Sequence, residues 1–289
     1  MQGAVFSANL LRFFEFADVH AKRTAVSRLD VGERAVRAAL RRRGLVWNGE
    51  RDPTPLLVPR GRHRVRHYAL LGHYSYRLFL RDVLKQRADL RPATLGRYVS
   101  PPVVARYLRF LVGAGLLRPA GRGRYRLADT RVVSFGGTLE WYVAEVLRRE
   151  LGCDAAYGLR IAGAAHGGDY DVLACAEGEV IYAETKSAPP RQIVQGEIGA
   201  FLDRVDTLRP DVALFVADTT LRMRDKLVPM FEEETARRRL GWQAIRLERE
   251  TWSVGPEVYL VNADPDLARN IRTCVARHFR SRGIAVAGR

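Results

Sequence analysis

The chain has 289 residues, of which 47% are hydrophobic, and a formal net charge of +16. This hydrophobic share excludes a disordered chain, and no apolar run reaches the roughly 18 residues that a membrane-spanning helix needs. The three cysteines are scattered and form neither a disulfide framework nor a Cys/His zinc motif. We therefore expect a cytoplasmic protein with no membrane as partner.

The positive charge is concentrated in one half of the chain. Residues 1–131 hold 27 lysines and arginines against 9 aspartates and glutamates, whereas residues 132–289 hold 21 against 23. A solvated surface in an arginine-rich protein is the alternative explanation, but such an excess would be spread along the whole chain. The asymmetry indicates that the first half contacts a polyanion such as nucleic acid.

Residues 1–70 are expected to form a basic helical region, with a possible degenerate helix-turn-helix within 7–60. Asp30 is a candidate cap for a helix whose Val36 and Leu40 point inward. The following stretch, 52–67, carries prolines and a basic run, and is predicted as a loop. Two histidines in it, His63 and His67, have a spacing that would allow metal ligation, but they are interpreted as solvated phosphate contacts.

Residues 71–131 have a clearer pattern, with helices predicted at 76–87, 92–98 and 102–112. Val104, Leu108 and Leu111 form the buried stripe of the third helix, after Ser100 as cap and Pro101 at the first helical position. Two short strands around a Gly/Arg turn follow. Arginines on this segment are the candidate nucleic-acid contacts: Arg97, Arg106, Arg109, Arg122, Arg124 and Arg126, the last three alternating so as to share one strand face.

Residues 74–130 resemble the winged helix-turn-helix of transcription regulators, in which a helix ending in a Gly-Leu-Leu turn precedes a basic wing. The resemblance implies that the helix 102–112 enters a major groove and that the wing contacts the DNA backbone. Many winged helices bind proteins instead, which is the alternative for this segment.

Residues 132–289 open with a helix that begins near Gly136 and is stopped by Gly152. Glu140 lies on or beside its apolar stripe. A carboxylate there is costly unless it is paired or binds a metal, although Glu140 could also simply favour the helix N-terminus. The two explanations stay open on the sequence alone.

A hairpin of two strands follows, with Asp171–Ala176 and Glu179–Lys186 joined by a tight turn at Glu177 and Gly178. Glu184 and Lys186 are two residues apart and therefore point to the same side of their strand. Asp171 enters the facing strand. The hairpin thus predicts that an aspartate, a glutamate and a lysine converge at one place on a sheet.

The lysine adds weight to this pattern because the chain has only 4 lysines against 44 arginines. A lysine where arginine serves almost everywhere else suggests that a compact ammonium group is needed. The alternative is an ordinary Glu/Lys pair on the surface of a strand.

The Asp…Glu-x-Lys pattern resembles the PD-(D/E)xK (restriction endonuclease-like) nuclease superfamily from about Gly136 to Asp218. The local sequence around it is similar to that of archaeal Holliday-junction resolvases and of nuclease domains of defence proteins. The resemblance implies that Asp171, Glu184 and the carbonyl of Thr185 bind Mg²⁺ or Mn²⁺, that Glu140 supports the metal, and that Lys186 positions the attacking water. No proline precedes the aspartate, which leaves Asp169 as an alternative to Asp171.

The remaining predicted elements complete a fold of the α+β class: a mainly α winged-helix region followed by an α/β restriction endonuclease-like domain with a mixed sheet. Helices are predicted at 192–208, 221–239 and 265–282, and strands at 157–162, 211–217, 242–247 and 257–261. Gln195 or Glu197 on the first of these helices is a further candidate for the site.

The sequence therefore predicts three regions, 1–70, 71–131 and 132–289, in a metal-dependent endonuclease. Its expected partner is DNA, duplex or branched. A homodimer is also expected, because nucleases of this kind often dimerise to cut both strands. Two alternatives remain: a DNA-binding regulator that keeps the fold without catalysis, and a subunit active only with a partner protein.

Overall fold

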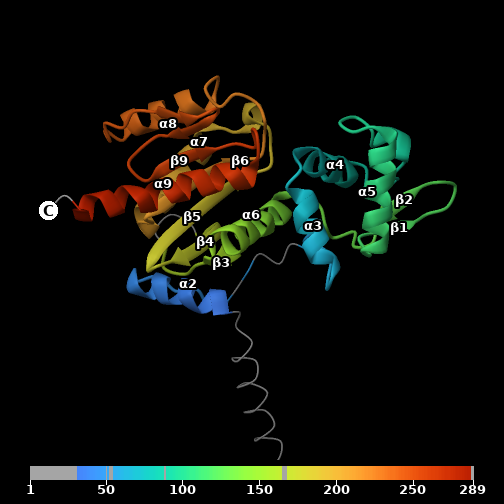
Figure 1. Ribbon diagram of the computed structural model, residues 1–289, viewed down its shortest axis with the longest axis horizontal. Coiled ribbons are helices and arrows are strands. Elements are labelled where there is room, and N and C mark those ends of the chain that lie inside the picture. Colours follow the sequence, from blue (N-terminus) through green and yellow to red (C-terminus); the bar gives the residue numbers. More distant parts are fainter. Residues whose placement is uncertain (1–30, 50, 52–54, 88, 165–167, 288–289) are drawn as a thin grey trace, which may run out of the picture.

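The structure, a computed structural model, describes residues 31–49, 51, 55–87, 89–164 and 168–287. Figure 1 shows a β-sheet body with helices on both faces and, beside it, a smaller lobe of helices and one hairpin. The part of the predicted 7–60 unit that precedes Val31 lies outside the described residues.

The body is built on a mixed sheet of seven strands in the order β3-β4-β5-β6-β9-β8-β7. Neighbours β5, β6 and β9 run parallel, and the other neighbouring pairs are antiparallel. This confirms the predicted α+β class and mixed sheet. The short central strand of the last three, β8, was not anticipated. The strand bounds are β3 (Asp154–Arg160), β4 (Asp169–Ala176), β5 (Glu179–Lys186), β6 (Val212–Ala217), β7 (Ile245–Glu248), β8 (Thr251–Ser253) and β9 (Val258–Val261).

Helices cover both faces of this sheet. The central strand β6 is buried at every residue, which requires a layer of helices on each face. One face, with Val172 and Ala183, packs in a core with helices α6 (Gly136–Leu151) and α9 (Leu267–Ala287). The other face, with Tyr182 and Phe215, packs against α7 (Gln195–Leu208) and α8 (Leu227–Arg237).

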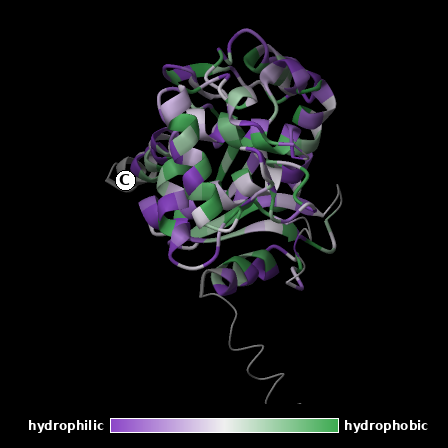
Figure 2. Ribbon diagram, turned by 90° about the vertical axis from the view of Figure 1, so that its right-hand side faces the viewer, coloured by the Kyte–Doolittle hydropathy of each residue, from purple (hydrophilic) through white to green (hydrophobic). Residues whose placement is uncertain are grey.

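Helix α2 (Val31–Arg42) buries Val36 and Leu40, as predicted. Their core includes Ala156 and Leu159 of β3, so α2 covers the sheet of the second half of the chain. In Figure 2 the α2 ribbon alternates between hydrophobic and hydrophilic residues, as a helix with one buried face does.

The smaller lobe contains the helices predicted at 76–87 and 102–112 and the predicted hairpin, whereas only a three-residue 3₁₀ turn stands where a helix was predicted at 92–98. It consists of α3 (His63–Leu71), α4 (Tyr74–Lys85), a 3₁₀ turn η1 (Pro92–Thr94), α5 (Pro101–Gly113) and the paired strands β1 (Leu117–Pro119) and β2 (Tyr125–Leu127). Val104, Leu108 and Leu111 are buried along α5, as their spacing predicts. Leu90 forms a single bridge to Tyr125, which adds a third segment beside the hairpin.

Two further expectations for the first half were wrong. The stretch 52–67 is not a loop throughout, because α3 begins at His63 and buries His67 completely, stacked on Phe110, where it is out of reach of phosphate. Burial lowers the pKa of His67 to about 4. Arg122 and Arg124 lie in the turn between β1 and β2, so only Arg126 of the three is on a strand.

A buried ion pair joins the lobe to the body. Arg77 of α4 and Asp218, directly after β6, are both fully buried, and Arg77 Nη2 lies 2.9 Å from Asp218 Oδ1. Arg81 also pairs with this carboxylate. Because Asp218 N donates to the carbonyl of Lys186 over 2.9 Å, the lobe is anchored at the carboxyl ends of β5 and β6.

Among the described residues, no helix has the length and apolar character required to cross a bilayer. The sequence likewise predicted that no helix would span a membrane.

Candidate active site

The hairpin of β4 and β5 brings the predicted aspartate to the predicted glutamate. Its turn places Glu177 at φ 51° and Gly178 at φ 86°, a pair of left-handed residues whose twist matches that of two antiparallel strands. Val172 then lies opposite Ala183. This register ends one residue short of Asp171 and Glu184, and the charge of Glu184 acts on Asp171, so the end of the hairpin brings the two carboxylates near each other.

Asp171 is held by the residue that follows Glu184. Its Oδ2 accepts hydrogen bonds from the Thr185 backbone N–H over 2.7 Å and from the Thr185 hydroxyl over 3.1 Å. Burial, together with the negative charge of Glu184, raises the pKa of Asp171 to about 7. The carboxyl group is therefore poised between its neutral and charged forms near neutral pH.

Lys186 lies between two carboxylates. Its Nζ is 3.0 Å from Glu184 Oε1 and 2.8 Å from Glu197 Oε1 on α7, and its side chain is 18% exposed. Burial alone would lower the pKa of Lys186, but the charges of Glu184 and Glu197 raise it above its ordinary value. The ammonium group is thus kept charged and fixed in place. Of the two helix residues suggested by the sequence, Glu197 is the one that contacts Lys186.

Two members of the cluster were missed by the sequence analysis. Tyr182 donates its hydroxyl to Glu184 Oε2 over 2.5 Å, and Arg204 Nη1 lies 3.4 Å from the same oxygen. Both positions had a usable signal. Tyr182 precedes Glu184 by two residues on the same strand face, and Arg204 follows Glu197 by seven residues on the same helix face.

The structure separates the two aspartates that the sequence left as alternatives. The side chain of Asp169 is 81% exposed and lies 3.7 Å from Arg160. Asp171 instead points to Thr185 and interacts with Glu184. Asp171 is therefore the aspartate of the cluster.

Glu140 belongs to a helix that lies on the opposite face of the sheet from α7. It is half-buried on α6, which packs on the face that carries Val172 and Ala183, whereas Glu184 and Lys186 contact α7. Nowhere in the described residues do three His, Cys, Asp or Glu side chains gather closely enough to hold a metal. Glu140 does not join Asp171 and Glu184 in such a group.

The donor set still suits Mg²⁺. This ion takes hard oxygen ligands, usually keeps several waters, and is commonly held by only one or two carboxylates. Asp171 and Glu184 supply two carboxylates. Burial, together with the negative charge of Glu184, raises the pKa of Asp171. A divalent cation would remove that repulsion.

The predicted nucleic-acid contacts lie on the smaller lobe and are exposed. Arg106 and Arg109 project from α5 away from its buried stripe, and Arg97 lies beyond η1 with its guanidinium 5.2 Å from the centre of the Tyr98 ring. Within the turn, Arg124 is 3.7 Å from Asp89, so its charge is partly balanced.

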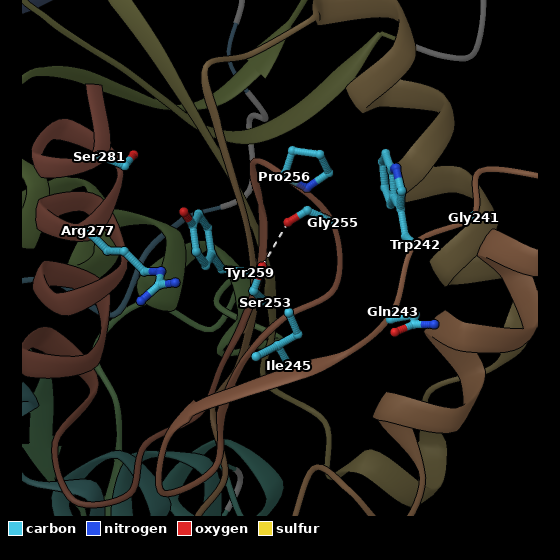
Figure 3. A pocket seen from close by; sticks show the side chains of 10 residues that line it. All are labelled: Gly241, Trp242, Gln243, Ile245, Ser253, Gly255, Pro256, Tyr259, Arg277 and Ser281. Carbon is cyan, nitrogen blue, oxygen red and sulfur yellow. Dashed lines mark hydrogen bonds between the residues drawn. The ribbon is translucent and has the colours of Figure 1, made fainter. Parts of the chain in front are cut away.

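Figure 3 shows a hollow at the far edge of the sheet, remote from this cluster. It encloses about 430 Å³ between β8, β9 and α9, with Trp242 at one side and Arg277 at the other. Ser253 donates to the carbonyl of Gly255 within it over 2.8 Å. None of the candidate catalytic residues lines this hollow.

Fold and site together define an α+β protein with a mixed sheet and a carboxylate–lysine cluster. No family model matches the sequence, and no curated protein matches it. Among solved structures, Can2 from Sulfobacillus thermosulfidooxidans in complex with cyclic tetra-adenylate is 12% identical with a TM-score of 0.48, and the match covers 84% of this chain and 60% of Can2.

The protein VC1899 from Vibrio cholerae is similar at the same level. It is 15% identical with a TM-score of 0.48, and the match covers 85% of this chain and 61% of VC1899. The chain spans about three fifths of the length of both neighbours. At this similarity neither neighbour defines the family or the activity of this chain.

Proposed function

We propose that the protein is a metal-dependent nuclease that hydrolyses phosphodiester bonds of DNA. The observation that carries the proposal is the meeting of Asp171, Glu184 and Lys186 at the ends of two paired strands. Hydrolysis of a phosphodiester needs positive charge at the phosphoryl oxygens and a positioned water molecule, and these three side chains can provide for both.

In this proposal Asp171, Glu184 and the carbonyl of Thr185 hold Mg²⁺ or Mn²⁺, in keeping with the resemblance to PD-(D/E)xK nucleases. The bound ion supplies Lewis acidity to the phosphodiester and lowers the pKa of the attacking water. Glu140 of α6 has the supporting role for this metal that the resemblance implies.

Lys186 has the role of orienting the attacking water and stabilising negative charge as the phosphorus is attacked. Its ammonium has three donors and no acceptor, and two of the directions are taken by Glu184 and Glu197. The third remains for a water molecule or a phosphoryl oxygen. Glu197 thus acts as a positioning residue for Lys186.

The DNA would be held by the smaller lobe used as a winged helix. The exposed Arg106 and Arg109 lie three residues apart on one side of α5, where a helix in a major groove presents its contacts. Arg126 on β2 and Arg122 in the turn would contact the phosphate backbone beside it.

Incubation of supercoiled plasmid with the protein in Mg²⁺, in Mn²⁺ and in EDTA tests the activity. We expect nicked and linear products with either metal and intact plasmid in EDTA. Equal cleavage in EDTA would contradict metal dependence, and intact plasmid in every condition would contradict the nuclease.

One observation favours the second candidate, a DNA-binding protein without catalysis. Both oxygens of Glu184 already have partners in Lys186, Tyr182 and Arg204, so the cluster satisfies itself without a metal. For such a protein we expect salt-sensitive binding of DNA, with no effect of Mg²⁺ on thermal stability at pH 8.

A further inference from the structure

A cleft lies between the smaller lobe and the carboxyl ends of β5 and β6. It encloses about 760 Å³. Its body side begins with Ser187, the residue after Lys186, and includes Asp218 and Thr219 after β6. Its lobe side is formed by α4 together with Arg97 and Tyr98. The cleft therefore opens directly beside the candidate active site.

Two buried polar atoms on the lobe side of the cleft lack a partner. Within the part of the chain that the structure describes, neither Arg81 Nε nor Asp82 Oδ2 has a hydrogen bond. Asp82 is 7% exposed, and the nearest cation, Lys85, approaches its other oxygen at 3.8 Å. A buried donor and a buried acceptor without partners are costly, and a ligand that offers both groups would satisfy them.

The rim of the cleft adds charge and an aromatic surface. Lys85 has a side chain that is 71% exposed, and Arg97 and Arg191 are exposed as well. Tyr98 is 43% exposed and presents an aromatic ring at this rim. Cations beside an exposed aromatic ring are the combination that single-stranded nucleic acid requires, since the cations follow the phosphates and the ring stacks on a base.

The volume of the cleft lies in the range of roughly 300–1,000 Å³ that accepts ligands of small-molecule size, which favours one or two nucleotides over a longer duplex. The base edge supplies what the buried atoms lack, because every base carries both a hydrogen-bond donor and an acceptor on its pairing edge. In a duplex those edges are occupied.

We propose that this cleft binds one or two unpaired nucleotides of a single strand, next to the phosphodiester presented to Lys186. Tyr98 stacks on a base, Arg81 Nε and Asp82 Oδ2 bind its free edge, and the rim cations contact phosphates. The inference rests on the proposed function only in taking nucleic acid as the ligand. It narrows the substrate to DNA with a single-stranded portion.

Binding measured in EDTA, without cleavage, tests this assignment separately from the nuclease. The probes are a fluorescently labelled single-stranded 12-mer and a blunt duplex of the same sequence, followed by anisotropy. We expect Tyr98→Ala and Asp82→Asn each to weaken binding of the single strand by roughly tenfold and to leave binding of the duplex unchanged. The matched control is Arg246→Ala, an exposed cation on β7, which should alter neither.

Several results would overturn the assignment. Unchanged affinity for the single strand in both variants, or an equal loss for strand and duplex, would do so. Displacement of the strand by micromolar free dAMP would show a nucleotide pocket instead of a strand site. Because Tyr98 is exposed, its variant should fold, and circular dichroism checks this for both. If the protein cleaves plasmid and the cleft variants bind the single strand normally, the proposed nuclease activity is retained and only the assignment of the cleft is rejected.

Discussion

Asp171 is oriented and its pKa is set by residues of the facing strand. Thr185 fixes its orientation, and burial with the charge of Glu184 raises its pKa to about 7. Since this pKa lies above that of the unfolded chain, the folded protein binds the proton more tightly, and its stability falls as the pH rises towards 7 and through it. Above that pH the charged carboxylate remains as a cost unless a cation offsets it.

Replacement of Asp171 by asparagine should remove this cost. In the absence of metal we expect Asp171→Asn to be more stable than the wild type at pH 8, and the difference to exceed that at pH 5 by on the order of 2 kcal/mol. Urea unfolding at the two pH values measures it. A difference that does not change with pH would contradict the raised pKa.

The same group makes metal binding compete with a proton. Below pH 7 a metal must displace the proton of Asp171, so we expect the affinity for Mn²⁺ to fall by up to about tenfold for each pH unit. Titration calorimetry between pH 5.5 and 8.5 tests this. An affinity that is flat over the range, or one that Asp171→Asn leaves unaltered, would exclude Asp171 as a ligand.

At the residue scale the sequence predicted Asp171, Glu184 and Lys186, because strand pairing and the two-residue period place them together. Tyr182 on the same strand face and Arg204 on the helix face of Glu197 were missed. The approach of Arg204 also depends on how α7 crosses over the sheet. Glu140 is the converse case, since helical spacing placed it beside a buried face but could not tell which face of the sheet that would be.

At the scale of elements, α5 carries the proposed contact with duplex DNA. We expect Arg106→Ala and Arg109→Ala each to weaken DNA binding and, where the arginine contacts a phosphate, to reduce the slope of log affinity against log salt concentration by about 1. Anisotropy over a range of salt concentrations measures the slope. Unchanged affinity and slope in the double variant would contradict a role for α5 in binding.

Most elements could be predicted because their signals are local. Strand β5 has the predicted bounds, and Gly152 ends α6 in a left-handed conformation at φ 67°. The short segments were harder. Strand β8 has only three residues, and the turn of β1 and β2 absorbs Arg122 and Arg124 because Gly121 and Gly123 bend the chain earlier than simple alternation suggests.

At the scale of the whole molecule, one buried ion pair connects the basic lobe to the body. Arg77 and Asp218 have no exposed surface, so removal of Asp218 leaves the buried charge of Arg77 without its carboxylate partner. We expect Asp218→Ala to lower the free energy of unfolding by roughly 3–5 kcal/mol, and Arg77→Leu combined with Asp218→Leu to cost less. Chemical denaturation measures both, and a loss below 1 kcal/mol in Asp218→Ala would contradict the structural role of the pair.

This connection could not be predicted from the sequence. The charge asymmetry indicated a basic half and a balanced half, yet α2 from the basic half packs on β3 and β4 of the other. The distribution of charge indicates which surfaces contact a polyanion. It does not predict that α2, with Leu40, packs in one core with Leu159 of β3, a residue more than a hundred positions away.

The central claim is that Asp171, Glu184 and Lys186 form a metal-dependent centre for hydrolysis. It is tested most directly by cleavage of supercoiled plasmid and of branched DNA in Mg²⁺ or Mn²⁺ by the wild type, by Lys186→Ala and by the control Arg246→Ala. We predict metal-dependent cleavage by the wild type and the control, and its loss in Lys186→Ala with DNA binding retained. Cleavage by Lys186→Ala at the wild-type rate would contradict the claim.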